Sequence, residues 1–283
     1  MSPSFVTPLR YPGGKARLGA WLSEIISANN LGDTCYVEPY AGGAGAALYL
    51  LSNGFVPQIW INDADPVIYS FWWTLLNEND WLIESIKNEE ITIENWRKHK
   101  SIIENPDDKE TREIGFSAFF LNRSNRSGII KGGVIGGINQ SGKYKIDARF
   151  NKEKLIQRIN KIYKLRDSIK ISKLDALEVI ELIKKSKEKH FIYFDPPYFN
   201  KADQLYRNFY EEKDHKSVSK EILSLESPWI VTYDNCEEIR NIYESANTTD
   251  LSFKYSTHLN RPKAKELLFY KNIKISIPPY MKR

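Results

Sequence analysis

The chain has little cysteine and no long apolar run, and both shortages limit what it can be. Its two cysteines, Cys35 and Cys236, cannot form a disulfide framework, so we expect unpaired thiols in a reducing cytosol. Its four histidines are scattered and share no ligand spacing with the cysteines, so no metal site is expected. No stretch approaches the roughly 20 apolar residues that cross a bilayer, and the first residues lack a signal-peptide core. The sequence therefore predicts a cytoplasmic protein without a membrane partner.

Positive charge, in contrast, is concentrated in one segment. Residues 122–166 contain twelve lysines and arginines but only Asp147 and Glu153 as acids, an excess of ten positive charges. The rest of the chain has 29 basic and 34 acidic residues. Such a segment is typical of a protein that binds a polyanion. Residues 151–166 have helical apolar spacing, so their charges could simply be the solvated face of a helix.

The order of expected elements predicts an α/β sheet that is interrupted by an insert. Apolar runs that read as strands alternate with helical patterns, first around residues 34–75 and again from residue 168 onward. Residues 79–121 read instead as consecutive helices. Six glycines between residues 128 and 142 separate short β-branched runs, which favours a β-hairpin or a pair of loops. We expect a sheet domain in 1–75 and 166–283 and a mainly helical insert in 76–165.

A glycine-rich stretch, AGGAGAAL, follows the first expected strand and opens a helix. Gly42, Gly43 and Gly45 would let the backbone approach a ligand closely, with helix amides pointing at it. Asp63 ends the next strand 21 positions after Gly42, where Rossmann-like sites hold a ribose. Glu38 would place a second carboxylate over the same pocket. The spacing lacks the strict G-x-G-x-x-G pattern, which disfavours a dinucleotide, and a plain glycine turn with a helix-capping acid is the alternative.

The stretch FDPPY ends another expected strand and holds an acid and an aromatic ring in fixed relation. Pro196 and Pro197 fix two φ angles and remove two backbone donors directly after Asp195. Ligands bind at the carboxyl ends of strands in open α/β sheets. The Asp195 carboxylate and the Pro196 carbonyl could accept the hydrogens of an aromatic amine, while Tyr198 stacks on the base. A second copy, IPPY at 277–280, lacks the acid and is assigned no role.

Four stretches carry a resemblance to a known family, in this order: YPGGKARL, VEPYAGGAGAAL, IND and FDPPY. Through them the sequence resembles the DNA adenine methylase (Dam-like) family of S-adenosylmethionine-dependent site-specific DNA methyltransferases. The resemblance covers essentially the whole chain. It implies a Rossmann-like methyltransferase sheet, an inserted domain that recognises the DNA target, and no metal. It also implies methyl transfer from S-adenosyl-L-methionine to the exocyclic amine of a flipped adenine in double-stranded DNA. A cognate restriction endonuclease would be a further partner, in a bacterium or its phage.

The resemblance also assigns roles to residues. The expected catalytic residues are Asp195, Pro196, Pro197 and Tyr198. The expected cofactor-binding residues are Tyr11, Lys15, Glu38, Pro39, Gly42, Gly43, Gly45, Asp63, Asp175 and Asp195. Within that set, Lys15 would lie near the cofactor's carboxylate, Asp63 at its ribose and Asp175 at its adenine. A simple helix N-cap is the alternative role for Asp175.

The basic insert supplies the expected DNA contacts, which are Arg123, Asn125, Arg126, Lys131, Lys143 and Lys145. The first three would contact base edges or phosphates, and the lysines would contact phosphates. The alternative role for each lysine is surface solubility.

Three other functions remain open from the sequence. The same transfer could act on cytosine, RNA or a protein glutamine, although the acid that begins the DPPY stretch favours adenine. An NAD(P)-dependent oxidoreductase also fits the glycine loop and its acid. A DNA-binding module without catalysis is disfavoured because every expected catalytic residue is present.

Overall fold

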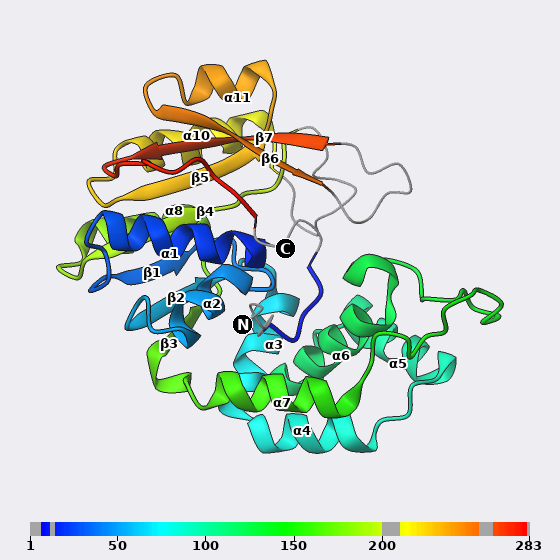
Figure 1. Ribbon diagram of the computed structural model, residues 1–283. Coiled ribbons are helices and arrows are strands. Elements are labelled where there is room, and N and C mark those ends of the chain that lie inside the picture. Colours follow the sequence, from blue (N-terminus) through cyan, green and yellow to red (C-terminus); the bar gives the residue numbers. More distant parts are fainter. Residues whose placement is uncertain (1–6, 12–14, 200–209, 255–262, 282–283) are drawn as a thin grey trace. The chain divides into compact units, whose positions relative to one another are not determined.

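The computed structural model describes residues 7–11, 15–199, 210–254 and 263–281 (Figure 1). It divides into two compact units. The helical unit comprises residues 1–14 and 65–167, and the sheet unit comprises residues 15–64 and 168–283.

The sheet unit is built on seven described strands that form one sheet. They are β1 (Cys35–Glu38), β2 (Gln58–Asn62), β3 (Ile169–Ser172), β4 (His190–Phe194), β5 (Trp229–Asp234), β6 (Asn247–Lys254) and β7 (Lys263–Lys271). Their order across the sheet is β3-β2-β1-β4-β5-β7-β6. All pairs from β3 to β5 are parallel, and β7 runs antiparallel to both β5 and β6. The expected Rossmann-like methyltransferase sheet is confirmed.

Helices cover both faces of this sheet, as parallel strands joined by crossovers require. The described helical elements of the unit are η1 (Lys15–Leu18), α1 (Gly19–Ala28), α2 (Gly45–Ser52), α8 (Ala176–Lys185), α10 (Glu212–Leu223) and α11 (Glu237–Ile242). Val37, Ile192 and Val231, from three neighbouring strands, are buried in one cluster with side chains of α8, α10 and α11. The mutually packed α1 and α2 lie on the opposite side of the sheet (Figure 1).

The helical unit contains α3 (Pro66–Asn77), α4 (Asn79–Asn88), α5 (Ile93–Glu104), α6 (Thr111–Ser124), η2 (Arg126–Gly128) and α7 (Lys152–Tyr163), and η3 (Arg166–Ser168) leads out of it. Asp65 caps α3 by accepting a hydrogen bond from the Val67 amide at 2.9 Å. Gly115 brings α6 against α3, because a Cβ there would lie 2.4 Å from the Ser70 carbonyl oxygen. No helix in the described part of the chain has the length and apolar character to cross a membrane.

Two features of this unit differ from the sequence expectation. Helix α3 belongs to the helical unit through its packing on α6, whereas 66–75 were expected with the sheet. The expected β-hairpin after residue 122 is wrong. The strand pairing described there is one bridge, between Asn125 and Val134. Positive φ angles at Gly128, Gly136 and Gly137 turn the chain repeatedly, so this segment forms the loop pair that was the other expectation.

Candidate active site

The carboxyl ends of the parallel strands place several predicted residues along one edge of the sheet. Glu38 is the last residue of β1, Asp63 directly follows β2, and Asp195 directly follows β4. Strands β1 and β4 are neighbours, and the chain proceeds from β1 toward β2 on one side and continues from β4 toward β5 on the other. This reversal is the topological switch point at which open α/β sheets bind ligands. The fold therefore brings the glycine loop and the DPPY stretch to the same place.

The turn after β1 is tied directly to the acid after β2. Gly42 has a φ of +47° and its amide donates a hydrogen bond to Asp63 Oδ2 at 2.9 Å. A side chain would strain that left-handed conformation, which explains glycine at this position. Gly43, also buried, continues the turn, and Ala44 adopts the left-handed region (φ +46°) before α2 begins. The predicted pairing of glycine loop and acid is thus present in the folded chain.

Two of the predicted cofactor residues at this turn already have structural partners. Gly45 is a packing glycine, because a Cβ there would lie 2.6 Å from the Ala16 Cβ. Glu38 is almost fully buried and accepts a hydrogen bond from the Ala47 amide at 2.9 Å, at the start of α2. Burial raises the pKa of Glu38 to about 8. Their roles toward a cofactor remain predictions.

Asn62, for which the sequence suggested no role, holds three strand ends together. Its amide nitrogen donates to the carbonyls of Pro39 and Leu174, both at 2.9 Å. Its oxygen accepts from the Ser172 hydroxyl at 2.7 Å. These bonds fix the segments that follow β1 and β3 beside the end of β2. The predicted residue Pro39 is thereby held through its backbone.

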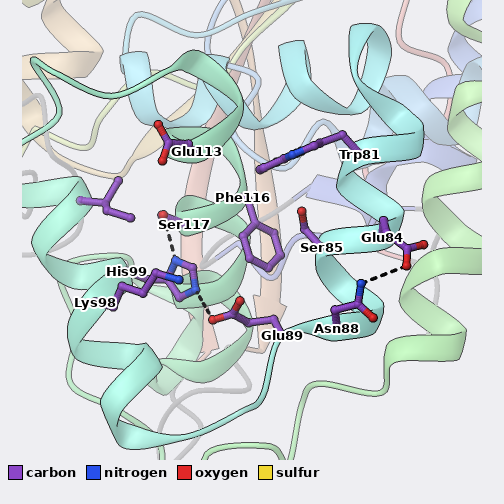
Figure 2. A pocket seen from close by; sticks show the side chains of 11 residues that line it. Trp81, Glu84, Ser85, Asn88, Glu89, Lys98, His99, Glu113, Phe116 and Ser117 are labelled. Atoms are coloured by element: carbon purple, nitrogen blue, oxygen red, sulfur yellow. Dashed lines mark hydrogen bonds and ion pairs between the residues drawn. The ribbon is translucent and has the colours of Figure 1, made fainter.

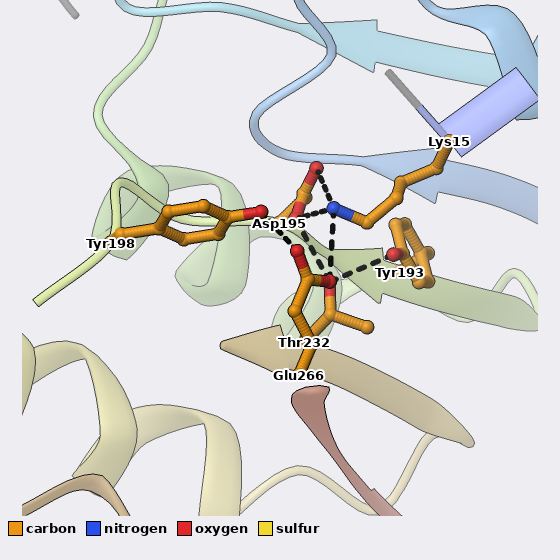
Figure 3. Close-up of polar contacts among 6 residues, drawn as sticks. All are labelled: Lys15, Tyr193, Asp195, Tyr198, Thr232 and Glu266. Carbon is orange, nitrogen blue, oxygen red and sulfur yellow. Dashed lines mark hydrogen bonds and ion pairs between the residues drawn. The ribbon is translucent and has the colours of Figure 1, made fainter. Parts of the chain in front are cut away.

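An ion pair between buried Lys15 and half-buried Asp195 lies at the end of β4 (Figure 3). Lys15 Nζ is 2.9 Å from Asp195 Oδ1 and 3.1 Å from Oδ2. The Thr232 hydroxyl donates to the same Oδ1 at 2.8 Å, and Tyr193 shares a 2.8 Å hydrogen bond with Thr232. Burial alone would lower the pKa of Lys15, but the nearby carboxylates outweigh it and raise that pKa well above its usual value. Lys15 is therefore a permanent cation beside Asp195.

A second carboxylate, Glu266 on β7, completes this cluster. It lies 3.4 Å from Lys15 Nζ and accepts a hydrogen bond from the Tyr198 hydroxyl. Lys15 Nζ is 5.8 Å from the centroid of the Tyr198 ring. Neither Thr232 nor Glu266 was predicted from the sequence. Residue type in β5 could have signalled Thr232, which is a polar residue among Trp229, Ile230 and Val231, whereas β7 contains three lysines besides Glu266 and gave no such signal.

Asp175 and Tyr11 are two further predicted cofactor residues. Asp175 is exposed and caps α8, accepting from the Leu177 amide at 2.8 Å within a capping box. The capping interpretation is thereby confirmed, and a ligand role remains a prediction. Tyr11 belongs to the helical unit, so its expected place beside the cofactor also remains a prediction. Pro196 and Pro197 are buried between Asp195 and Tyr198.

Among the predicted DNA contacts, Asn125 is a structural residue. Its side chain is fully buried, and its oxygen accepts from the Trp96 indole nitrogen at 2.6 Å. Its amide nitrogen donates to the carbonyls of Ile129 and Ile130 at 2.9 Å. These bonds use the polar atoms of Asn125 to hold the root of the loop pair, and its contact with DNA stays a prediction.

Arg123 is likewise bound to backbone, but it lies within a cluster of like charges. Its guanidinium donates to the Arg149 carbonyl and, at 3.4 Å, to the Pro8 carbonyl. Burial and the neighbouring Arg10, Arg158 and Arg149 lower the pKa of Arg123 to about 9. In the described part of the chain none of these four arginines forms an ion pair with a carboxylate. Such uncompensated charge favours an anionic partner.

The remaining predicted DNA contacts project from the loop pair. Arg126, Lys131, Lys143 and Lys145 are all on its solvent side. Lys143 Nζ lies 5.8 Å from the centroid of the exposed Tyr144 ring. Basic side chains beside an exposed aromatic ring suit a nucleic-acid backbone, and contact with one stays a prediction.

The helical unit also contains a pocket of about 370 Å³ (Figure 2). His99 bridges two of its lining residues, with Nδ1 2.9 Å from the Ser117 hydroxyl and Nε2 3.1 Å from Glu89. This order resembles a hydrolytic triad. Ser117, however, lies in the interior of α6, where the helix uses the backbone amides that an oxyanion hole would need. Burial lowers the pKa of His99 to about 4, so it is a neutral linker that ties α5 to α6.

The sheet order, the switch-point glycine turn and the Asp-Pro-Pro-Tyr segment together define an α/β methyltransferase. No group of three potential metal ligands occurs among the described residues. The chain belongs to the D12 class N6 adenine-specific DNA methyltransferase family, which it matches over residues 11–257. It is therefore an enzyme that methylates adenine in DNA. Membership of this family excludes the alternative functions: an NAD(P)-dependent oxidoreductase, a DNA-binding module without catalysis, and methyl transfer to cytosine, RNA or a protein glutamine.

Comparison with individual proteins gives more distant similarities. A type II methyltransferase of Methanocaldococcus jannaschii is 24% identical over 208 residues, which is 67% of this chain and 68% of that protein. Among solved structures, an rRNA methyltransferase from Streptomyces viridochromogenes has a TM-score of 0.38 at 10% identity and covers 90% of this chain and 83% of its own. An rRNA methylase from Streptococcus thermophilus has a TM-score of 0.37 at 8% identity, covering 91% and 95%.

Proposed function

We propose that Asp195 and the backbone carbonyl of Pro196 accept the hydrogens of the target adenine amine, in double-stranded DNA whose target base is flipped out. The observation that carries this proposal is the position of Asp195 directly after β4, at the switch point beside the glycine turn. A base within a duplex cannot reach such an edge, so flipping is required at a cost of a few kcal/mol. Tyr198, next to the prolines, supplies a ring on which the base could stack.

The donor set at the strand ends fits S-adenosylmethionine. The carboxylate of Asp63 suits a ribose diol, and the Gly42 turn beside it permits close approach of backbone. The buried ammonium of Lys15 suits the carboxylate of the methionine part. Gly43, Glu38 and Pro39 would line the same turn. Asp175 would bind the adenine of the cofactor, and Tyr11 would line the cofactor pocket.

The chain's own residues act on the amine rather than on the methyl donor. When bound, the cofactor supplies the methyl group, so that its sulfur–carbon bond breaks, a nitrogen–carbon bond forms at N6, and a proton leaves N6. Asp195 accepts a hydrogen bond from that amine and directs its lone pair toward the methyl carbon. Thr232, through its bond to Oδ1, holds the Asp195 carboxylate in one orientation. Exclusion of water by the buried prolines strengthens these interactions.

We place the DNA interface on the helical unit. Its support is the basic loop pair with Arg126, Lys131, Lys143 and Lys145, together with the cluster of Arg10, Arg123, Arg149 and Arg158, which lack carboxylate partners among the described residues. Phosphodiesters are the anions of matching geometry for guanidinium groups. The enzyme would act at the nucleoid in the cytoplasm. By analogy with its type II relative, it would protect sites against a cognate endonuclease.

One experiment tests most of this proposal. The protein is expressed in cells that lack DNA methylation, and modified bases are mapped along the genome by long-read sequencing. We expect N6-methyladenine at one short recurrent sequence and no modification from Asp195→Ala expressed at the same level. Methylation by the Asp195→Ala variant would contradict the role of Asp195. Absence of N6-methyladenine with a folded wild-type protein would contradict the function itself.

A further inference from the structure

Glu266 is a carboxylate placed in the interior of the sheet unit at the catalytic edge. It lies on β7 directly opposite Asp234 of β5, and its side chain is 2% exposed. The next residue along β7, Leu267, faces the core cluster, so alternation turns Glu266 toward the other face. Thr232 lies on that face too, because Tyr233 between Thr232 and Asp234 packs in the core cluster. The strand pleat alone thus brings Glu266 beside the groups that hold Asp195.

Burial of a carboxylate is costly unless it is compensated, and the partners described for Glu266 are residues of the catalytic cluster. Its Oε2 lies 3.4 Å from Lys15 Nζ, and its Oε1 accepts the Tyr198 hydroxyl bond. Figure 3 shows Lys15 Nζ between the carboxylates of Asp195 and Glu266. One buried cation is therefore shared between two anions, and the second anion also binds the tyrosine of the DPPY stretch.

This sharing matters because Lys15 competes with a substrate for Asp195. An ammonium at 2.9 and 3.1 Å from both Asp195 oxygens occupies the positions at which an amine would donate hydrogen bonds. It also neutralises the charge that makes the carboxylate a strong acceptor. A second carboxylate within reach gives Lys15 an alternative partner without exposing the cation to water.

We propose that Glu266 is a positioning residue for methyl transfer, which draws Lys15 away from Asp195 and fixes the Tyr198 ring. The inference rests on the proposed roles of Asp195 and Tyr198. Without the charge of Glu266, Asp195 is the one described carboxylate left beside Lys15, and it becomes a weaker acceptor for the adenine amine. Without its acceptor oxygen, the Tyr198 ring loses the bond that fixes its rotation. Both effects fall on the chemical step rather than on binding.

The test compares purified variants in single-turnover and steady-state methylation of a DNA duplex that carries the enzyme's own site. Glu266→Gln keeps the shape and the acceptor oxygen but removes the charge. We expect its kcat to fall by about 10–100-fold, with the KM for S-adenosylmethionine within about 3-fold of wild type. Glu266→Asp restores the charge and should recover part of that loss. Tyr198→Phe removes only the hydroxyl and should lower kcat by a smaller factor.

A matched control is available in the same unit. Tyr280 donates a hydrogen bond to Glu24 at 2.6 Å, so Glu24→Gln removes the charge of another tyrosine-bound carboxylate outside the cluster. We expect Glu24→Gln to retain wild-type kcat. A folded Glu266→Gln with unchanged kcat would overturn the inference, and so would an equal loss in kcat and in cofactor affinity. If Glu266→Gln does not fold, unchanged kcat in Tyr198→Phe overturns it. A wild-type protein that makes no N6-methyladenine would instead overturn the proposed function.

Discussion

Lys15 Nζ lies 2.9 Å from Asp195 Oδ1, although 180 positions separate the two residues in the chain. Lys15 begins η1, and Asp195 follows β4. Their contact joins the first and the last of the sequence motifs in one buried cluster. It also means that the acid assigned to catalysis is paired with a cation.

Asp195→Asn should therefore remove transfer while leaving the fold intact. Asparagine preserves the shape of the side chain but loses the charge that binds Lys15 and the adenine amine. We expect kcat to fall by at least about 100-fold. Calorimetric titration with S-adenosyl-L-homocysteine should still show measurable binding. A variant with more than a tenth of wild-type kcat would contradict a catalytic role for Asp195.

Asp63→Ala should weaken cofactor binding. The substitution removes the acceptor of the Gly42 amide and the carboxylate expected at the ribose. We expect the dissociation constant for S-adenosyl-L-homocysteine to rise by about 10–100-fold, as the loss of charged hydrogen bonds predicts. Asp33→Ala is the control, because Asp33 is an exposed partner of Lys189 outside the site. An unchanged constant in Asp63→Ala would show that the cofactor lies elsewhere.

The lysines of the loop pair should contribute to DNA affinity by binding phosphates. For Lys143→Ala with Lys145→Ala, the slope of log affinity against log salt should become shallower by about 1 for each phosphate that is no longer bound. Fluorescence anisotropy on one duplex at several salt concentrations measures that slope. Lys184→Ala with Lys185→Ala, on α8 of the sheet unit, removes the same charge and should leave it unchanged. Equal effects of both pairs would indicate a general electrostatic effect and contradict local binding of phosphates.

Asn125→Ala should destabilise the helical unit. It would leave the Trp96 indole N–H and the carbonyls of Ile129 and Ile130 without their partner. Unpaired buried groups of this kind cost about 2–4 kcal/mol together. Urea unfolding followed by tryptophan fluorescence measures the loss. Asn139→Ala, at an exposed position of the same loop pair, should change stability by less than about 0.5 kcal/mol. A stable Asn125→Ala with weak DNA binding would contradict this structural role and favour the direct DNA contact that the sequence predicts.

Acid should destabilise the protein partly through His99. The pKa of His99 is lowered from 6.5 to about 4 in the folded protein, mainly by burial. The unfolded chain therefore binds the proton more readily between these values, and stability falls as pH decreases from about 6.5 toward 4. The contribution is at most about 3 kcal/mol. Burial also lowers the pKa values of His190 and His215, so the comparison is with His99→Gln, which cannot titrate. A wild-type pH dependence that matches His99→Gln would contradict this assignment.

Local patterns predicted most of the sheet unit and much of the site. The apolar runs that became β1, β2, β4 and β5 could be identified from residue type because each is buried on both faces. Once the strands alternate with helices, their carboxyl ends must share an edge. The meeting of Asp63 with Gly42 follows from that rule, and so does the position of Asp195.

Other features could not be predicted because they depend on contacts between distant segments. The loop pair was ambiguous in the sequence, because β-branched runs between glycines fit a hairpin equally well. Helix α3 packs closely on α6 because α6 has Gly115 at the contact with Ser70 of α3. These two residues are 45 positions apart in the chain, so a local pattern does not show their contact. The basic surroundings of Asn125 predicted a contact with DNA. They could not show that its side-chain oxygen accepts a hydrogen bond from the indole N–H of Trp96, which lies on α5.

The sequence by itself determined the chemistry of this protein, because the residues that act on the amine and the cofactor lie in short motifs at strand ends. Tertiary structure decided how those residues are held. Thr232 and Glu266 belong to no motif, and only the order of β4, β5 and β7 in the sheet brings them to Asp195, Lys15 and Tyr198. The physical reason is the separation along the chain of the residues that interact. A motif records what neighbouring residues do together, whereas a buried charge is balanced by whichever segments the fold packs around it.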